Sequence, residues 1–149
     1  MSGLESGAGE TRPKVVVVFG VFDLLHPGHL MFLKAARQRG DRLIVVATRD
    51  ERVQAEKGRA PYYRLEERMS MLSALECVDE VVPGDPAGAW TMVEQLAPDV
   101  ICLGHDQNVD HPKIMAQIGR LVTRPQIIQL DAFERKRYST SAICRALDI

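Results

Sequence analysis

Residues 15–20 of the chain read VVVVFG, a run of five apolar residues that ends at a glycine. Continuous apolarity, without alternating polar residues, is typical of a strand that is covered on both faces, as in a parallel sheet. Directly after it, Leu30, Leu33 and Ala36 recur at helical spacing, and Gly40 is predicted to stop that helix. The chain is therefore expected to begin with a buried strand followed by a helix.

The same alternation continues to the end of the chain. Further strands are predicted at residues 43–47, 81–82, 100–103 and 127–128. Further helices are predicted from about Arg64, around the apolar sets Trp90/Val93/Leu96 and Ile114/Ile118/Leu121, and from Ser139 or Thr140 through Ile143 and Leu147. The polar stretch from Arg49 to Tyr63 is predicted to be a long connection. Strands that alternate with helices predict the α/β class, with a doubly wound parallel sheet in a single domain.

Length, charge and composition limit the number of domains and the kinds of partner that the chain is expected to have. A chain of 149 residues fits one domain, here residues 14–149, after a Gly/Ser/Glu-rich start (1–13) that we interpret as a disordered tail. The net charge of −1 lacks the basic excess of a nucleic-acid binder, so the expected partner is a small ligand. No apolar run approaches the ~20 residues of a membrane span. The start also lacks the layout of a signal peptide.

The cysteines point to a reducing compartment. Cys77, Cys102 and Cys144 are widely spaced, with no CxxC pair, and each lies among apolar residues. We interpret them as small buried hydrophobic residues, which fits a cytoplasmic protein.

Ligands of doubly wound sheets bind beyond the carboxyl ends of the strands, so the turns after strands are the places to search. In the first turn, Pro27 and Gly28 stand between His26 and His29 at the predicted start of a helix. Free N–H groups and the helix dipole make such a start an anion site, and two imidazoles there can donate to phosphate oxygens. A metal pair or two solvated histidines are the alternatives; zinc is disfavoured because nothing nearby completes its ligand set.

At this point the sequence resembles a known family. Residues 20–23 (GVFD) followed by residues 26–29 (HPGH) look like the signature of the cytidylyltransferase-like nucleotidyltransferases, and the resemblance covers nearly the whole chain from Val15. The family has a Rossmann-like fold and includes glycerol-3-phosphate cytidylyltransferases, phosphopantetheine adenylyltransferases and archaeal-type FAD synthetases. The resemblance implies an enzyme that transfers a nucleotidyl group from ATP or CTP to a phosphate-bearing acceptor and releases pyrophosphate.

The family's residue roles carry over to matching positions. They imply catalytic roles for His26, His29 and Lys57. They imply nucleotide binding by Val21, Phe22, His26, Pro27, Gly28, His29, Asp106, Tyr138, Ser139, Thr140 and Ser141. Contacts with substrate or phosphate are expected of Asp23, Arg68 and Arg137, whereas His105 and His111 are interpreted as surface residues. Solvated charge in the second turn and simple helix capping by the hydroxyl groups remain the alternatives. No protein-bound metal is expected; Mg²⁺ or a similar divalent cation is expected to accompany the nucleotide.

One departure from the family bears on activity. Many members have Thr where this chain has Val21, so a hydroxyl contact is lost while the backbone N–H can remain. This leaves a non-catalytic nucleotide-binding regulatory module as the rival from another class.

The acceptor is less constrained than the reaction. The sequence around Arg49–Pro61 and Gly104–Gln107 looks most like the archaeal-type FAD synthetases, which adenylylate FMN. Glycerol-3-phosphate cytidylyltransferase and sugar-phosphate adenylyltransferases are the alternatives, and a homodimer is expected by analogy with relatives.

Overall fold

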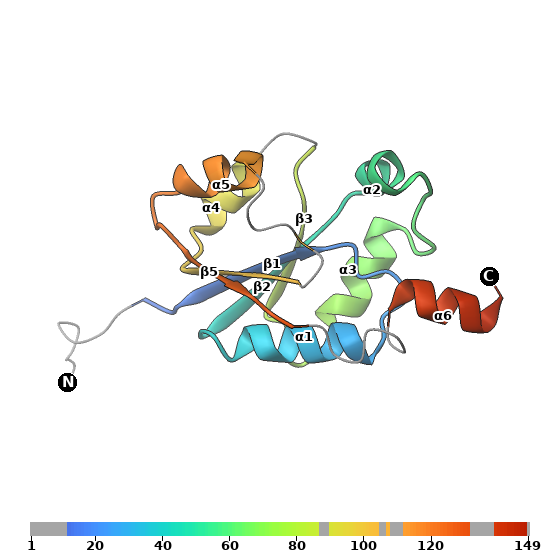
Figure 1. Ribbon diagram of the computed structural model, residues 1–149. Helices are drawn as coiled ribbons and strands as arrows, with labels where there is room; N and C mark the ends of the chain where they lie inside the picture. Colours follow the sequence, from blue (N-terminus) through green and yellow to red (C-terminus); the bar gives the residue numbers. More distant parts are fainter. Residues whose placement is uncertain (1–11, 87–89, 105–106, 108–111, 132–138, 149) are drawn as a thin grey trace.

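A computed structural model describes residues 12–86, 90–104, 107, 112–131 and 139–148 (Figure 1). Its strands are β1 (Val15–Gly20), β2 (Arg42–Ala47), β3 (Glu80–Pro83), β4 (Val100–Leu103) and β5 (Gln126–Gln129). Its helices are α1 (Pro27–Arg37), α2 (Asp50–Lys57), α3 (Leu65–Ser73), α4 (Thr91–Leu96), α5 (Pro112–Gly119) and α6 (Thr140–Leu147). The described chain begins inside the predicted tail, and Arg12 there donates to Asp99.

The five strands form one parallel sheet in the order β3-β2-β1-β4-β5. The predicted doubly wound α/β fold is confirmed. β1 lies in the centre, because it pairs with β2 on one side and with β4 on the other. Val16, Val17 and Val18 have no exposed surface, which explains why the strand has no polar alternation.

Helices cover both faces of the sheet (Figure 1). On one face, Leu33 and Ala36 of α1 and Leu72 of α3 pack in the same cluster as Val16 and Val18. On the other, Val93 of α4 and Ile118 of α5 pack with Ile101 of β4. Alternate residues of the central strands therefore serve two separate hydrophobic layers.

The connection predicted from Arg49 to Tyr63 is wrong over half its length, because residues 50–57 form helix α2. Val53 is the one residue of that helix that is buried, so no apolar period marks it. Charge supports the helix instead: Arg52 and Glu56 pair at 2.7 Å one turn apart, and acidic residues occupy its first turn. Gly58 ends it in the left-handed conformation, at φ 74°.

Helix α1 ends earlier than predicted, at Arg37, with Gln38 as a right-handed C-cap. Gly40 has a different role, because a Cβ atom there would lie 2.7 Å from the Val16 side chain and 2.8 Å from the Lys14 carbonyl oxygen. Among the described residues, none of the helices has the length and apolarity needed to span a bilayer.

Candidate active site

The candidate site lies at the carboxyl edge of the sheet, where the strand order reverses. From β1 the chain moves outward to β2 and β3, and it then returns to the other side of β1 as β4. In open parallel sheets, ligands usually bind outside the carboxyl ends of the strands at such a reversal, which here lies between the turns that follow β1 and β4. The turn after β2 meets the same edge, since Thr48 N–H donates to the Gly20 carbonyl at 2.9 Å. All three predicted turns therefore begin at one edge.

The turn after β1 depends on Gly20 and Phe22. Phe22 has φ 53°, in the left-handed region, and its ring is only 5% exposed. A Cβ atom on Gly20 would lie 2.7 Å from this ring, so the glycine makes room for it. The Phe22 ring packs against Phe32 and meets the His29 ring edge-on, with centroids 5.4 Å apart. The side chain thus belongs to the core, and Phe22 has only its backbone to offer a nucleotide.

His26 and His29 form a reciprocal cap at the start of α1. His26 is the N-cap, and its Nδ1 accepts from the backbone N–H groups of Gly28 (3.0 Å) and His29 (3.3 Å). In return, the His29 Nδ1 accepts from the His26 N–H at 3.3 Å. The two rings stack with centroids 3.7 Å apart and planes 25° apart. Pro27 occupies the first helical turn, as predicted.

This capping arrangement fixes the state of both rings. A neutral imidazole has one acceptor and one donor nitrogen, so an accepting Nδ1 leaves the proton on Nε2. Burial lowers the pKa of His26. Burial, followed by the neighbouring charges of His26 and Lys57, lowers the pKa of His29 to about 3. At neutral pH the pair therefore presents two neutral Nε2–H donors beside the N-terminus of α1.

Lys57 approaches this pair from the second turn. It is the exposed last residue of α2 and precedes the left-handed Gly58. Its charge is among those that lower the pKa of His29, which places the two side chains within electrostatic reach. Two of the three residues predicted to be catalytic thus lie together at one helix start, and the third comes from the segment that follows the neighbouring strand β2.

Asp23 and Arg68, predicted to contact substrate, both bind the protein itself. The Asp23 carboxylate accepts from the backbone N–H groups of Tyr62 (2.6 Å) and Tyr63 (3.0 Å). The Arg68 side chain is 0% exposed and donates to the Val21 carbonyl, the Tyr63 carbonyl and Asp50. Asp50 was missed in the sequence, because its role depends on a partner 18 positions away.

In the third turn, a side chain bridges the ends of the two strands next to this reversal. The Gln107 side chain accepts from Gly104 N–H at 2.7 Å and donates to the Phe19 carbonyl at 3.4 Å. It therefore links the ends of β4 and β1. Asp106, predicted to bind nucleotide, lies outside the described residues.

At the predicted second signature, Ser139 is the N-cap of α6, and its hydroxyl accepts from Ala142 N–H at 3.0 Å. Thr140 and Ser141 form the first turn of that helix. Tyr138 and Arg137 lie outside the described residues.

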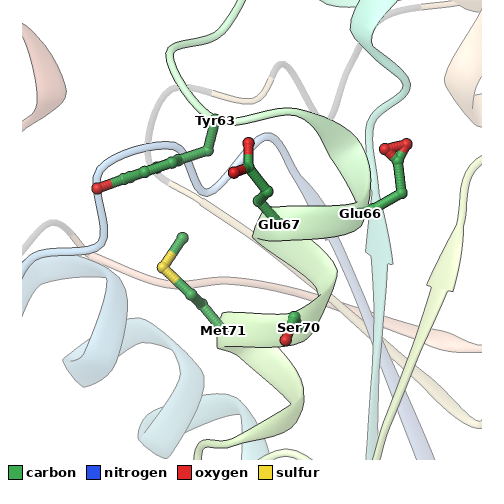
Figure 2. A pocket seen from close by; sticks show the side chains of 5 residues that line it. All are labelled: Tyr63, Glu66, Glu67, Ser70 and Met71. Carbon is green, nitrogen blue, oxygen red and sulfur yellow. The ribbon is translucent and has the colours of Figure 1, made fainter.

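A shallow pocket of about 400 Å³ lies on α3 and the loop before it. Figure 2 shows its lining side chains, Tyr63, Glu66, Glu67, Ser70 and Met71. Hydrogen bonds from Arg64 lower the pKa of the Glu67 carboxyl, so that group is ionised at neutral pH. Its negative charge disfavours an anion, so the pocket does not extend the phosphate site.

Comparisons with known proteins agree with this geometry. The sequence profile described as cytidylyltransferase-like matches residues 17–146. The FAD synthase of Pyrococcus abyssi is 39% identical over 142 residues, which cover 94% of this chain and 95% of that protein. The FAD synthase of Thermococcus sibiricus is 40% identical over 134 residues, 89% of this chain and 90% of that protein. A crystal structure described as a lipopolysaccharide core biosynthesis protein from Thermoplasma volcanium superposes with a TM-score of 0.76 at 31% identity, over 83% of this chain and 100% of that one.

Proposed function

Because the chain belongs to the cytidylyltransferase-like family, we propose that it is a nucleotidyltransferase that adenylylates FMN to FAD and releases pyrophosphate. The FAD synthases that it resembles along most of both chains support FMN as the acceptor. The main structural support for nucleotidyl transfer is the stacked His26–His29 pair, with two Nε2–H donors at a helix N-terminus. Glycerol 3-phosphate and a sugar phosphate stay the alternative acceptors.

The reaction needs no covalent intermediate with the protein. A phosphate oxygen of FMN attacks the α-phosphorus of ATP, the bond from that phosphorus to the bridging oxygen breaks, and pyrophosphate leaves. Negative charge then builds on the non-bridging oxygens of the α-phosphate and on the oxygen that leaves with pyrophosphate, and preorganised donors stabilise it. The Nε2–H groups of His26 and His29 supply two such donors at no cost in reorientation, since the cap already holds both rings.

We assign Lys57 to the phosphates as a mobile point charge on an exposed helix end. Val21 and Phe22 contribute through the backbone, because the first has no hydroxyl and the second has a buried ring. The Ser139–Ser141 helix start, with the side chains of Asp106, Tyr138 and Arg137, completes the proposed nucleotide site.

Mg²⁺ or a similar divalent cation is proposed to enter with ATP and to neutralise its phosphates. In the turn that carries the family signature (residues 20–29, the signature turn), the Asp23 carboxylate already accepts two backbone N–H groups. Phosphate oxygens and water would therefore supply most ligands of the cation. Within the described residues no group of three or more His, Cys, Asp or Glu is disposed to hold a metal.

The decisive experiment incubates the purified protein with Mg²⁺ and either ATP or CTP. FMN, glycerol 3-phosphate or a sugar 1-phosphate is the acceptor, and pyrophosphate release is followed. The expected result is that only the pair of ATP and FMN reacts, with FAD as the product identified by chromatography. Pyrophosphate release with a sugar phosphate would show that FMN is not the acceptor, while the reaction would still be nucleotidyl transfer. ATP binding without release in any pair would indicate a regulatory module and overturn the proposal.

The compartment, the oligomeric state and the partners belong to the same proposal. The three cysteines are all free thiols, which suits a reducing cytoplasm. A homodimer stays a prediction, and light scattering at micromolar concentration would test it. Small molecules are the proposed partners, with no nucleic acid or membrane among them.

A further inference from the structure

We propose that Asp23, Asp50 and Arg68 are positioning residues, a brace that holds the segment carrying Lys57 against the signature turn. The inference rests on the proposed function, because its catalytic readout is FAD synthesis. It changes the role expected of Asp23 and Arg68 from contact with substrate to support of the groups that make that contact. It also adds Asp50, which no sequence pattern marked.

Arg68 joins three separate segments through one buried guanidinium. Nη1 donates to the Val21 carbonyl of the signature turn at 2.9 Å, and Nε donates to the Tyr63 carbonyl before α3 at 3.0 Å. Nη2 donates to Asp50 Oδ1, at the start of α2, at 2.6 Å. The side chain has 0% exposed surface, so it is not offered to a nucleotide. A planar fork of donors is the group best suited to such a junction.

The bond to Val21 also sets the direction of a backbone donor. The described peptide bonds are all trans, and a trans peptide points its C=O and its N–H in opposite directions. Because Arg68 draws the Val21 carbonyl toward α3, the Phe22 N–H points to the other side of the turn. Phe22 can contribute to nucleotide binding only through its backbone, so Arg68 orients one of the proposed phosphate donors.

The carboxylates of Asp50 and Asp23 hold the two ends of the segment that carries Lys57. Asp50 Oδ2 accepts from Leu65 N–H at 3.2 Å, which links the start of α2 to the start of α3. Asp23 accepts from Tyr62 N–H and Tyr63 N–H, which links the signature turn to the same stretch. The chain from Asp50 to Leu65 is therefore closed into a loop with both ends held. Lys57 lies inside it, within electrostatic reach of His29.

Charge favours this positioning role over direct contact. An aspartate aimed at a triphosphate would repel it, whereas an aspartate that accepts backbone N–H groups stabilises a loop conformation. The buried Arg68 cation requires a counter-charge, and Asp50 supplies it with a side chain 35% exposed.

The test compares Asp50→Asn and Asp23→Asn with a matched control, Glu80→Gln. Glu80 also pairs with an arginine across two elements, Arg42 at 2.8 Å, but at the opposite edge of the sheet. Hydrogen exchange is measured across residues 50–65 and across β1. In both Asp variants we expect faster exchange of residues 50–65 and unchanged exchange of β1. In the Glu80→Gln control we expect both regions to exchange as in the wild type. Unchanged exchange of residues 50–65 would overturn the brace whatever the protein's activity.

The catalytic readout is a double-mutant cycle with Lys57→Ala. A group displaced by about 1 Å costs roughly 10²-fold in turnover, so Asp50→Asn should lower kcat by at least about tenfold. In the Lys57→Ala background the same change should cost about twofold or less, because Asp50 holds the start of the segment that carries Lys57 and acts through that lysine. Equal losses in both backgrounds would overturn this part of the proposal. An inactive wild-type protein would instead refute the proposed function, and the exchange experiment would still decide the brace.

Arg68 is tested with Arg68→Lys, which keeps the charge and loses the fork. Lower kcat with a normal melting temperature supports the brace, and wild-type kcat refutes the part assigned to Arg68. If the variant does not fold, the two Asp variants decide.

Discussion

His29 should make the stability of the fold depend on pH between about 3 and 6.5. Its imidazole is held neutral, because burial and the charges of His26 and Lys57 lower its pKa to about 3 in the folded protein. In the unfolded chain the pKa returns to its ordinary value near 6.5. Between these two values the unfolded state binds more protons than the folded state. Stability is therefore complete above pH 6.5 and is lost progressively as the pH falls toward 3.

The size of the effect follows from the two pKa values. Between pH 8 and pH 5 the unfolded His29 becomes protonated and the folded one does not, which removes about 2 kcal/mol of the free energy of unfolding. For a chain of this length, that corresponds to a shift of roughly 1 M in the urea midpoint. The direction agrees with the hydrogen bonds, since protonation of His29 Nδ1 would place a donor against the His26 N–H.

The assay is urea unfolding at pH 8 and pH 5, for the wild type and for His29→Asn. Asparagine keeps an acceptor near the position of Nδ1 but does not titrate, and the other histidines cancel in the comparison. The wild type should lose about 2 kcal/mol more than the variant over this interval. Equal losses in the two proteins would refute the idea that His29 is held neutral by the fold.

Four further outcomes are expected. His26→Asn should keep the helix cap and the fold but lower kcat by about 10²- to 10³-fold, as measured by FAD formation; normal turnover would contradict the assigned donor. Gly20→Ala forces the Phe22 ring to move and should cost about 1–3 kcal/mol in urea unfolding, and an unchanged midpoint would show that the ring yields freely. Lys57→Ala should lower kcat while thermal melting stays at the wild-type temperature, since the side chain is exposed; a large drop in melting temperature would assign it to the fold instead. Arg68→Met removes the counter-charge of Asp50 and leaves the Val21 and Tyr63 carbonyls without their donor, so a loss of about 1–3 kcal/mol is expected in urea unfolding, and an unchanged midpoint would contradict the burial argument.

The parallel sheet was predictable because its central strands are buried on both faces and are therefore continuously apolar in sequence. Residues 15–19 and 43–47 are continuous apolar runs, and the structure shows that both faces of these strands are covered. Helix α1 was predictable for a related reason, since it buries Leu33 and Ala36 against the sheet. Helix α3 was predictable from its apolar period, although Arg68 takes one of its two buried positions beside Leu72.

Helix α2 was not predictable by the same means. Apolar periodicity reports burial, and α2 buries Val53 alone. Five of its other seven side chains are charged, and its stability depends on the Arg52–Glu56 pair, on the helix dipole and on the Gly58 cap. Each of these features also occurs in solvated loops, so composition did not distinguish the two.

Within the candidate site, the sequence indicated which residues gather but not how they are held. The spacing of His26 and His29 predicted a shared helix start, and the structure places them there. Their stacking and the acceptor role of both Nδ1 atoms depend on backbone angles that spacing does not encode. The burial of Arg68 depends on a carbonyl 47 positions away, and backbone acceptors leave no mark in the sequence.

The use of histidine as the N-cap of α1 has a consequence for how this protein can change. Asp, Asn and Ser are the strong N-caps, and a protein selected for stability alone would favour one of them at position 26. Substitutions of that kind at the helix start would raise thermal tolerance and remove a proposed reactive group in the same step. Attempts to make the protein more heat-resistant should therefore leave this helix start unaltered and concentrate on positions far from the carboxyl edge of the sheet, such as the exposed Val122.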